Sequence, residues 1–364
     1  MREVTLRPAR FRAHFPVLTD TVHLASCSLG PRSTALDAAM HRMLDLMHAD
    51  PMPWELWARE VEQARQRFAA LIGAGSDEVA VVSGATVAAY QIASTTDWAK
   101  RPAVVTTDAE YPSVAQVWAA QRPRGAEVVH AKETACADAV DERAALVSVP
   151  LVSYRSGQRM PVAEVTARAR AAGARVFVDA YQAAGVLDID VTELDCDYLV
   201  SGSMKYLLGL PGIAFLYVRR GLLGDLPPQL TGCFGEPDPA GFDPLTAPDA
   251  RRFEVTMPPL PVVLAANAGL SLVEQLDLAA VESHVDRLAR RAAERLNETG
   301  TEVVPGPQVL VPDPDPAGLS RWLAARRIFL ARGADARLSF HYFNTDSDVD
   351  TACAAIAEWK RARR

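Results

Sequence analysis

The stretch RVFVDAYQAAGVLDIDVTELDCDYLVSGSMKYL, residues 175–207, contains two short apolar runs that each lead to a charged residue. The first run, 176–178, ends directly in Asp179, and the second, 198–200, leads through small residues to Lys205. Runs of this length predict strands of a mainly parallel sheet, in which ligands bind at the carboxyl ends of the strands. Asp179 and Lys205 are therefore expected at one ligand-binding edge.

An aspartate and a lysine in these positions match the needs of pyridoxal 5′-phosphate (PLP). The aspartate would pair with the ring nitrogen and keep the pyridinium protonated, and the lysine would hold the aldehyde as a Schiff base. Taken alone, the pair also fits a strand that ends at a surface carboxylate and is followed by an ordinary lysine. Other residues in a matching order favour the PLP site.

Composition excludes several other classes of protein. The chain has 364 residues, 49% of them hydrophobic and 23% charged, with a net charge of −7 and no block of like charge. This argues against nucleic acid or an anionic membrane as a partner, and no apolar run is long enough to span a bilayer. The five cysteines and seven histidines form no CxxC or HExxH motif, so no metal site is expected. The N-terminus lacks the apolar core of a signal peptide, so we expect a cytoplasmic protein.

The fold is expected to be α/β, with a mainly parallel seven-stranded sheet flanked by helices. Helical stretches such as 86–94 and 162–172 separate several of the strand-like runs, which is typical of such a sheet. The expected strands are 79–82, 103–106, 127–129, 146–149, 176–178, 198–200 and 213–217.

The character of the sequence changes after the prolines at 258, 259 and 261. An amphipathic helix with apolar residues from 281 to 296, a strand-like segment at 336–343 and a helix at 349–359 predict a smaller C-terminal α+β domain. We therefore expect an N-terminal arm at 1–20, a large PLP-binding domain at 21–258 and a small domain at 259–364.

Two segments after predicted strands could bind the cofactor. Gly84, Ala85 and Thr86 form a small-residue turn that opens a helix, where free N–H groups and the helix dipole favour phosphate. A simple helix cap is the alternative interpretation. Tyr111 follows the next strand and could stack on the pyridine ring, or else pack within its own loop.

The order of these pieces resembles the class V aminotransferase family of fold-type-I PLP enzymes, which includes cysteine desulfurases, selenocysteine lyases, kynureninases and isopenicillin N epimerases. The resemblance runs from about residue 23 to 350 and is strongest over 179–212. It implies that Lys205 forms the Schiff base, that Asp179 pairs with the pyridine nitrogen and that Gln182 hydrogen-bonds the ring phenolate. It also implies a phosphate site at 84–86 and ring stacking by Tyr111.

Two further segments extend the resemblance to the substrate. Arg337 lies in ARLSFHYFNTDSDVD, which is similar to the family's RxSxHxYNT signature, whose arginine grips the substrate α-carboxylate. HLASCSLGP is similar to the family's entry loop and implies that Ser26 and Ser28 lie near the substrate.

The chain also departs from the family. Tyr111 stands where members often carry an acid–base histidine, and a phenol with a pKa near 10 is a poor base. Met204 replaces the histidine or tyrosine that commonly reaches the phosphate, so Ser203 or Ser201 is expected to substitute for it. Tyr154 stands where desulfurases have an asparagine near the phenolate.

The expected assembly is a homodimer with active sites at the subunit interface, because the resemblance implies it. The family threonine that reaches the partner's phosphate is matched only by Thr256, one position early, with Met257 in its place. Trp54 and Trp57 either line the substrate entrance or anchor a helix.

The expected activity is chemistry at Cα and Cβ of an amino acid or amino-acid-bearing metabolite, through an external aldimine and a quinonoid. Desulfurases that form a persulfide need a cysteine on the loop before the carboxylate-binding arginine, but residues 305–336 contain none. A C–S β-lyase without a persulfide relay is therefore favoured. An aminotransferase, epimerase or decarboxylating enzyme acting on a natural-product intermediate is the alternative. A binding protein of this fold that has lost catalysis is a third class, which the intact Asp179, Lys205 and Arg337 disfavour.

Overall fold

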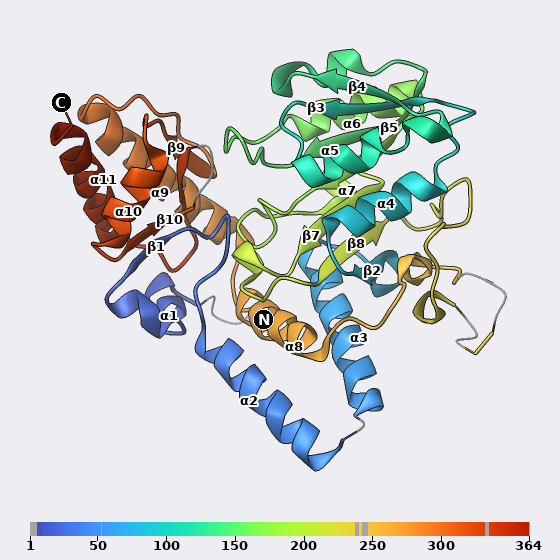
Figure 1. Cartoon of the computed structure of the whole chain (residues 1–364), viewed down its shortest axis with the longest axis horizontal. Coiled ribbons are helices and arrows are strands. Elements are labelled where there is room, and N and C mark those ends of the chain that lie inside the picture. Colours follow the sequence, from blue (N-terminus) through green and yellow to red (C-terminus); the bar gives the residue numbers. More distant parts are fainter. Residues whose placement is uncertain (1–5, 52, 237–239, 242–246, 332–334, 364) are drawn as a thin grey trace.

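The computed structural model describes residues 6–51, 53–236, 240–241, 247–331 and 335–363. At its centre is a seven-stranded sheet of order β2-β8-β7-β6-β5-β3-β4 (Figure 1). The strands from β3 to β7 run parallel, and β8 is antiparallel to both β2 and β7. The predicted α/β fold with a mainly parallel sheet is thus confirmed. Its strands are β2 Val79–Val82, β3 Ala103–Thr107, β4 Glu127–Ala131, β5 Ala144–Pro150, β6 Arg175–Asp179, β7 Tyr198–Gly202 and β8 Ala214–Val218.

Helices cover both faces of this sheet, which explains why β6 is apolar from residue 176 to residue 178. Phe177 belongs to the apolar cluster that includes α4 (Ala85–Thr95) and α5 (Pro112–Ala119). Its neighbours Val176 and Val178 belong to the cluster on the other face, with α3 (Trp54–Leu71) and α6 (Val162–Ala172). Since side chains alternate between faces, a strand covered on both sides needs an apolar residue at every position.

A smaller α+β unit lies beside the sheet, at the left of Figure 1. In it, β9 (Gln308–Val311) pairs antiparallel with β11 (Ala336–Ser339), next to α9 (Leu278–Glu298), α10 (Pro316–Ala324) and α11 (Asp346–Arg361). The strand-like segment predicted at 336–343 forms a strand only as far as Ser339. The predicted closing helix is present and is longer than expected.

Two contacts cut across the predicted domain boundaries at 21 and 259. β1 (Val22–Leu24), expected in the large domain, pairs in parallel with β10 (Ile328–Leu330) of the small unit. α8 (Leu260–Val273), expected in the small domain, packs against α3 and α2 (Thr34–Ala49). A strand of three residues carries no sequence signal for the sheet that it joins. The predicted domain boundaries therefore stay predictions. Residues 1–5 of the expected N-terminal arm lie outside the described residues.

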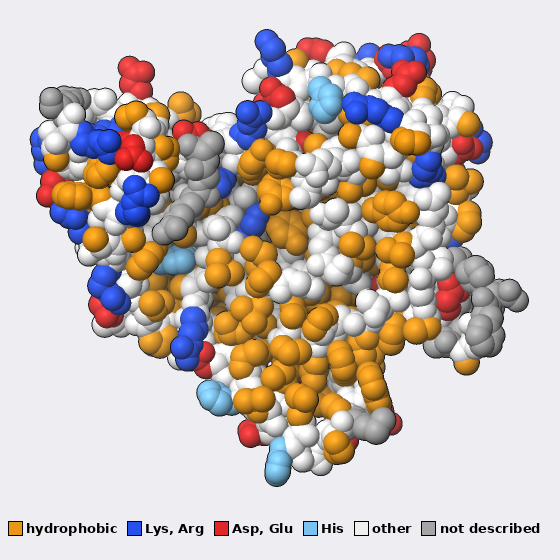
Figure 2. All heavy atoms as spheres, in the orientation of Figure 1, with side chains coloured by type: hydrophobic (Ala, Val, Ile, Leu, Met, Phe, Trp, Pro, Cys, Tyr) orange, Lys and Arg blue, Asp and Glu red, His pale blue; other side chains and the backbone are white. Residues whose placement is uncertain are grey.

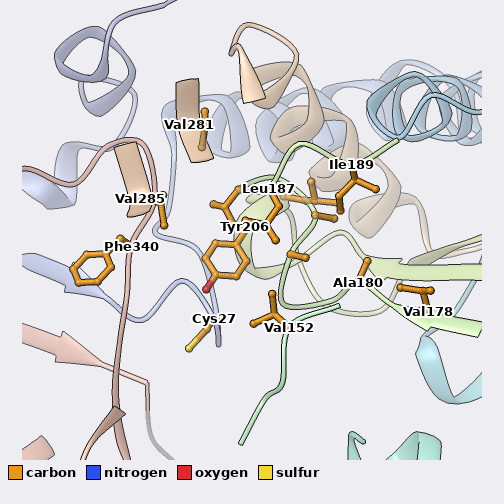
Figure 3. Close-up of a cluster of buried hydrophobic side chains, with 14 of the residues drawn as sticks. Cys27, Val152, Val178, Ala180, Leu187, Ile189, Tyr206, Val281, Val285 and Phe340 are labelled. Atoms are coloured by element: carbon orange, nitrogen blue, oxygen red, sulfur yellow. The ribbon is translucent and has the colours of Figure 1, made fainter. Parts of the chain in front are cut away.

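The apolar core continues from the sheet into the small unit. Val178 of β6, Val281 and Val285 of α9, and Phe340 after β11 belong to one buried cluster, together with Tyr206 (Figure 3). This shared core holds the small unit against the carboxyl ends of β6 and β7. The remaining helices are α1 (Pro8–Arg12) and α7 (Val191–Leu194).

Within the described residues, no single helix is long and apolar enough to cross a membrane. Only α8 and α9 taken together reach the length and composition, and they bend by 84° at their junction. Most residues of α8 are buried in the protein.

Candidate active site

A cavity of about 280 Å³ lies at the carboxyl ends of β5, β6 and β7. The sequence-predicted residues Ala85, Thr86, Tyr111, Tyr154, Asp179, Gln182 and Lys205 all line it. Its remaining lining residues are Ala109, Ser113, Pro150, Val152, Tyr181 and Met204. Residues separated by up to 120 positions along the chain thus meet at one edge of the sheet, as expected for a parallel α/β fold.

Asp179 and Lys205 form the floor of this cavity. Asp179 is the last residue of β6, and its Oδ1 accepts a hydrogen bond from the Tyr181 N–H at 2.8 Å. Burial raises the pKa of Asp179, whereas the Tyr181 N–H and the positive charge of Lys205 lower it. Burial lowers the pKa of Lys205, and the charge of Asp179 opposes this shift. A lysine with a lowered pKa carries more neutral amine at neutral pH, which is the form that attacks an aldehyde.

The backbone places the Lys205 side chain by an uncommon conformation. Lys205 begins the 3-10 helix η6 (Lys205–Leu207) with a φ of 64°, in the left-handed region that non-glycine residues rarely adopt. Its Nζ lies 5.0 Å from the centre of the Tyr181 ring. A local strain of this kind is typical of functional positions, because the surrounding fold must hold it in place.

The start of α4 offers hydrogen-bond donors to an anion. Gly84 is the N-cap residue, and no side chain caps the first turn of this eleven-residue helix. A Cβ placed on Gly84 would find no atom within 4 Å, so the space beside the helix start is open. An uncapped helix N-terminus that faces a cavity is a favourable phosphate site.

A hydrogen-bonded chain joins the small unit to the floor of the cavity. Gln308 of β9 donates from Nε2 to the Oε1 of Gln182 at 2.9 Å. Arg337 of β11 donates from Nη1 to the Tyr154 carbonyl at 2.6 Å and to the Gln308 Oε1 at 3.4 Å. With its oxygen occupied, the Gln182 amide has its N–H groups available for an acceptor in the cavity.

Two tyrosines form the wall above the floor. The rings of Tyr111 and Tyr154 are 5.4 Å apart and nearly perpendicular, at 83°. Tyr111 is 45% exposed at the N-terminus of α5 and lines the cavity. This arrangement is compatible with the predicted stacking on a flat ring.

Besides Gly84 and Ser201, five predicted residues do not line the cavity. Ser203 is buried, and its hydroxyl donates to the Leu210 carbonyl at 2.7 Å, within the turn that follows Lys205. Thr256 and Ser28 are exposed on loops, and Ser26 is buried. Arg337 does not line it either, but its bond to the Tyr154 carbonyl keeps it at the edge.

The sequence reasoning missed three residues of the site: Tyr181, Gln308 and Glu110. Glu110 is fully buried behind Tyr111 and accepts hydrogen bonds from the Ser148 hydroxyl at 2.5 Å and the Tyr111 N–H at 2.9 Å. Burial and the charge of Asp179 nevertheless raise the pKa of Glu110 to about 7. Their position in the sequence was the only indication of a role in the site. Tyr181 lies between Asp179 and Gln182, which were predicted to bind the cofactor, and Glu110 follows a strand and a short turn.

The donor set fits PLP. It provides a carboxylate for the ring nitrogen, an amide for the phenolate, a lysine amine for the aldehyde and an open helix start for the phosphate. These groups come from β6 and the turn after it, from η6 and from the start of α4, and they meet at one cavity large enough for a small molecule.

Comparisons with known proteins agree with this fold. The family profile described as aminotransferase class-V matches residues 34–315. The chain is 32% identical over 363 residues to the uncharacterized aminotransferase YcbU of Bacillus subtilis, covering 96% of this chain and 97% of that protein. It is 28% identical to a cysteine desulfurase of Serratia proteamaculans over 284 residues, 74% of this chain and 68% of that protein. The structure of a cysteine desulfurase from Thermococcus onnurineus NA1 superposes with a TM-score of 0.87 at 21% identity, covering 99% of both chains.

Proposed function

Because the chain belongs to the class-V aminotransferase family of PLP-dependent enzymes, we propose that it cleaves the C–S bond of a cysteine-type amino acid by β-elimination, without a persulfide relay. The observation that carries the proposal is the placement of Lys205 beside Asp179 on the floor of the cavity, with no exposed thiol among its lining residues. PLP, when bound, supplies an electron sink for the bond pair released at Cα.

Each residue of the site has a definite task in this reaction. The Lys205 amine would hold the aldehyde of PLP, and as a free amine it could take the proton from Cα of the substrate. Asp179 would pair with the ring nitrogen, and the Gln182 amide would donate to the phenolate. The Arg337 fork binds the α-carboxylate of the substrate. The Cα–H and Cβ–S bonds break, the sulfur leaves as a thiol with a proton, and hydrolysis releases pyruvate and ammonia.

The burial and the raised pKa of Cys27 support direct release of the thiol that leaves the substrate. Arg337 and Lys205 are close enough for their charges to lower the pKa of Cys27, but burial raises it more strongly. The residue is only 2% exposed and lies in the buried cluster shown in Figure 3. A relay cysteine must be accessible and must react as a thiolate, and Cys27 meets neither condition.

The test is incubation of the purified, PLP-loaded protein with L-cysteine and a series of S-substituted cysteines. Pyruvate, ammonia and the free thiol should appear in equal amounts, and Lys205→Ala should abolish all three. Cys27→Ala should retain pyruvate formation, because no sulfur is passed to that residue. Persulfide on the protein, or alanine in place of pyruvate, would contradict the proposal.

The second candidate is an aminotransferase, and the relative that matches nearly the whole chain favours it. That protein of Bacillus subtilis is described as an aminotransferase, at 32% identity over 96% of this chain. Incubation with amino donors in the absence of a keto acid should then convert the cofactor to its pyridoxamine form. Conversion with simple amino acids, combined with no release of thiol from any S-substituted cysteine, would select this candidate.

We further propose a homodimer, and the surface around α2 supports it. None of the sixteen residues of α2 is buried, although the helix contains Leu44 and Met47, which are 60% and 53% exposed. Apolar side chains gather over the part of the molecule where α2 and α8 lie (Figure 2). Contiguous apolar surface of this kind marks an interface in a water-soluble assembly.

Light scattering on size-separated protein tests the dimer. Leu44→Glu should reduce the measured mass from two chains to one, because a charge would be buried in the interface. Val304→Glu is the matched control, since Val304 is 66% exposed on the small unit and should leave the mass unchanged. A wild-type mass of one chain would refute the homodimer.

A further inference from the structure

The Tyr181 side chain reaches the start of α4. Tyr181 lies between Asp179 and Gln182 in the sequence and lines the same cavity. The Ala85 N–H, in the first helical position of α4, is close enough to the Tyr181 hydroxyl to lower the pKa of that phenol, against the larger opposite effect of burial. The phenol therefore crosses from the end of β6 to the helix start where an anion would bind.

Gly202 makes room for this orientation. A Cβ on Gly202 of β7 would overlap the hydroxyl end of the Tyr181 ring. Gly202 is buried, so no alternative path around a larger side chain is available there. The pairing of a glycine in β7 with a tyrosine after β6 thus holds the phenol at the phosphate end of the cavity.

The Tyr181 hydroxyl keeps its proton and can therefore donate a hydrogen bond. Burial, followed by the charges of Asp179 and Tyr111, raises the pKa of Tyr181 above its usual value. The hydroxyl consequently stays protonated at neutral pH and can give a hydrogen bond to an anion.

The phosphate end is short of other donors. Lys205 is the only lysine or arginine among the described residues that line the cavity, and the aldehyde needs its amine. Ser203, expected to reach the phosphate, donates to Leu210 instead, and Met204 has no donor. A dianionic phosphate at the start of α4 would otherwise depend on backbone N–H groups and the hydroxyls of Thr86 and Ser113.

We propose that the Tyr181 hydroxyl is a ligand of the cofactor phosphate and replaces the donors that Ser203 and Met204 do not supply. In the structure its oxygen lies near the Ala85 N–H. With an anion present, the N–H and the hydroxyl can both donate to it, so the two groups form one binding site. The proposal rests on the proposed placement of PLP with its phosphate at the start of α4.

The experiment compares PLP with pyridoxal, which lacks the phosphate, by spectral titration of the apoprotein. Tyr181→Phe should weaken PLP binding by about 10- to 100-fold, the usual loss for a hydrogen bond to a charged group. Pyridoxal affinity should stay within about twofold of wild type, because the ring contacts are kept. Tyr154→Phe is the matched control: it removes a hydroxyl from the same cavity, and it should change both affinities by the same factor.

Gly202→Ala provides a second, independent perturbation. Its methyl group displaces the phenol, so the same selective loss of PLP affinity is expected, and adding Tyr181→Phe should cause no further loss. An equal loss of PLP and pyridoxal affinity in Tyr181→Phe would place the hydroxyl at the ring and overturn the proposal. Unchanged PLP affinity would overturn it as well.

Failure of the cofactor placement itself has a different signature. Borohydride should reduce PLP onto Lys205 in wild type and in Tyr181→Phe, and the label is found by mass spectrometry. Labelling of another lysine would refute the placement of PLP, whatever the affinities of the Tyr181 variant.

Discussion

The floor and the rim of the active site are built in different ways. The floor, Asp179 and Lys205, comes from the end of β6 and from η6, which follows β7, and β6 and β7 are neighbouring parallel strands of one sheet. The rim, Gln308 and Arg337, comes from β9 and β11 of the small unit and reaches the floor through Gln182 and the Tyr154 carbonyl. The register of a single sheet fixes the floor, whereas the rim depends on how two units pack. Floor variants should therefore affect the chemical step, and rim variants the fit of the substrate.

The largest effect is expected on the floor, at Lys205. Lys205→Ala removes both the group that holds the aldehyde and the proposed base, so turnover should fall by at least about 10³-fold. Bound PLP should lose the absorbance band of its protein Schiff base, and borohydride should no longer fix the cofactor to the chain. Lys100→Ala, which alters an exposed lysine outside the cavity, is the control and should keep both properties. Retained turnover in Lys205→Ala would assign the chemistry to another group.

On the rim, the largest effect is expected at Arg337. Arg337→Lys keeps the charge but loses the planar fork that matches a carboxylate, so KM should rise by about 10- to 100-fold with a smaller change in kcat. A change mainly in KM is expected for a rim residue, whereas a change mainly in kcat is expected for a floor residue. Arg337→Gln should raise KM further and leave the cofactor spectrum unchanged. A fall in kcat at constant KM would instead assign Arg337 to the chemical step.

The sequence predicted the floor well because its signals are local. The run 176–178 before Asp179 was expected as a strand, and β6 spans Arg175–Asp179. The parallel direction of the strands then follows from their alternation with helices, so the two charged residues could be placed at one edge. Their individual roles were supplied by the family resemblance and stay predictions.

The rim could not be predicted to the same degree, because it depends on contacts between distant segments. Gln308 carries no local signal, and its bond to Gln182 spans 126 residues. The direction of the Tyr181 side chain depends on the absence of a Cβ at Gly202, one strand away. Ser203 was expected at the phosphate, but its hydroxyl is used by the turn that presents Lys205.

A smaller effect is expected where rim and floor meet, at Gln308. Gln308→Leu keeps the size of the side chain and removes the hydrogen bond to Gln182. A hydrogen bond between neutral groups changes an equilibrium constant by roughly 2- to 10-fold. The absorbance maximum of bound PLP should shift, since the amide that faces the phenolate is no longer fixed. Gln275→Leu, on the surface, makes the same chemical change outside the site and should have no effect. An unchanged spectrum would show that the two regions are independent.

The smallest effect is expected from Glu110, which lies behind the floor. Its carboxyl faces Asp179, Cys136 and the hydroxyls of Thr106 and Ser148, and no lysine or arginine pairs with it among the described residues. Burial and the charge of Asp179 raise the pKa of Glu110 to about 7. The folded apoprotein therefore binds this proton more tightly than the unfolded chain does, where the pKa of glutamate is about 4.3.

The sign of the pH dependence follows from this difference. The contribution of Glu110 to stability is fully present below about pH 4 and is lost as the pH rises through about 7. Glu110→Gln removes the ionisation, so its melting temperature relative to wild type should increase by a few degrees, about 2–6 °C, between pH 5 and pH 8. Thermal melts of both apoproteins at several pH values measure the difference. A difference that is constant with pH would mean that Glu110 is already ionised at pH 5. The charged Asp179 would then have a second charged carboxylate beside it instead of a protonated one.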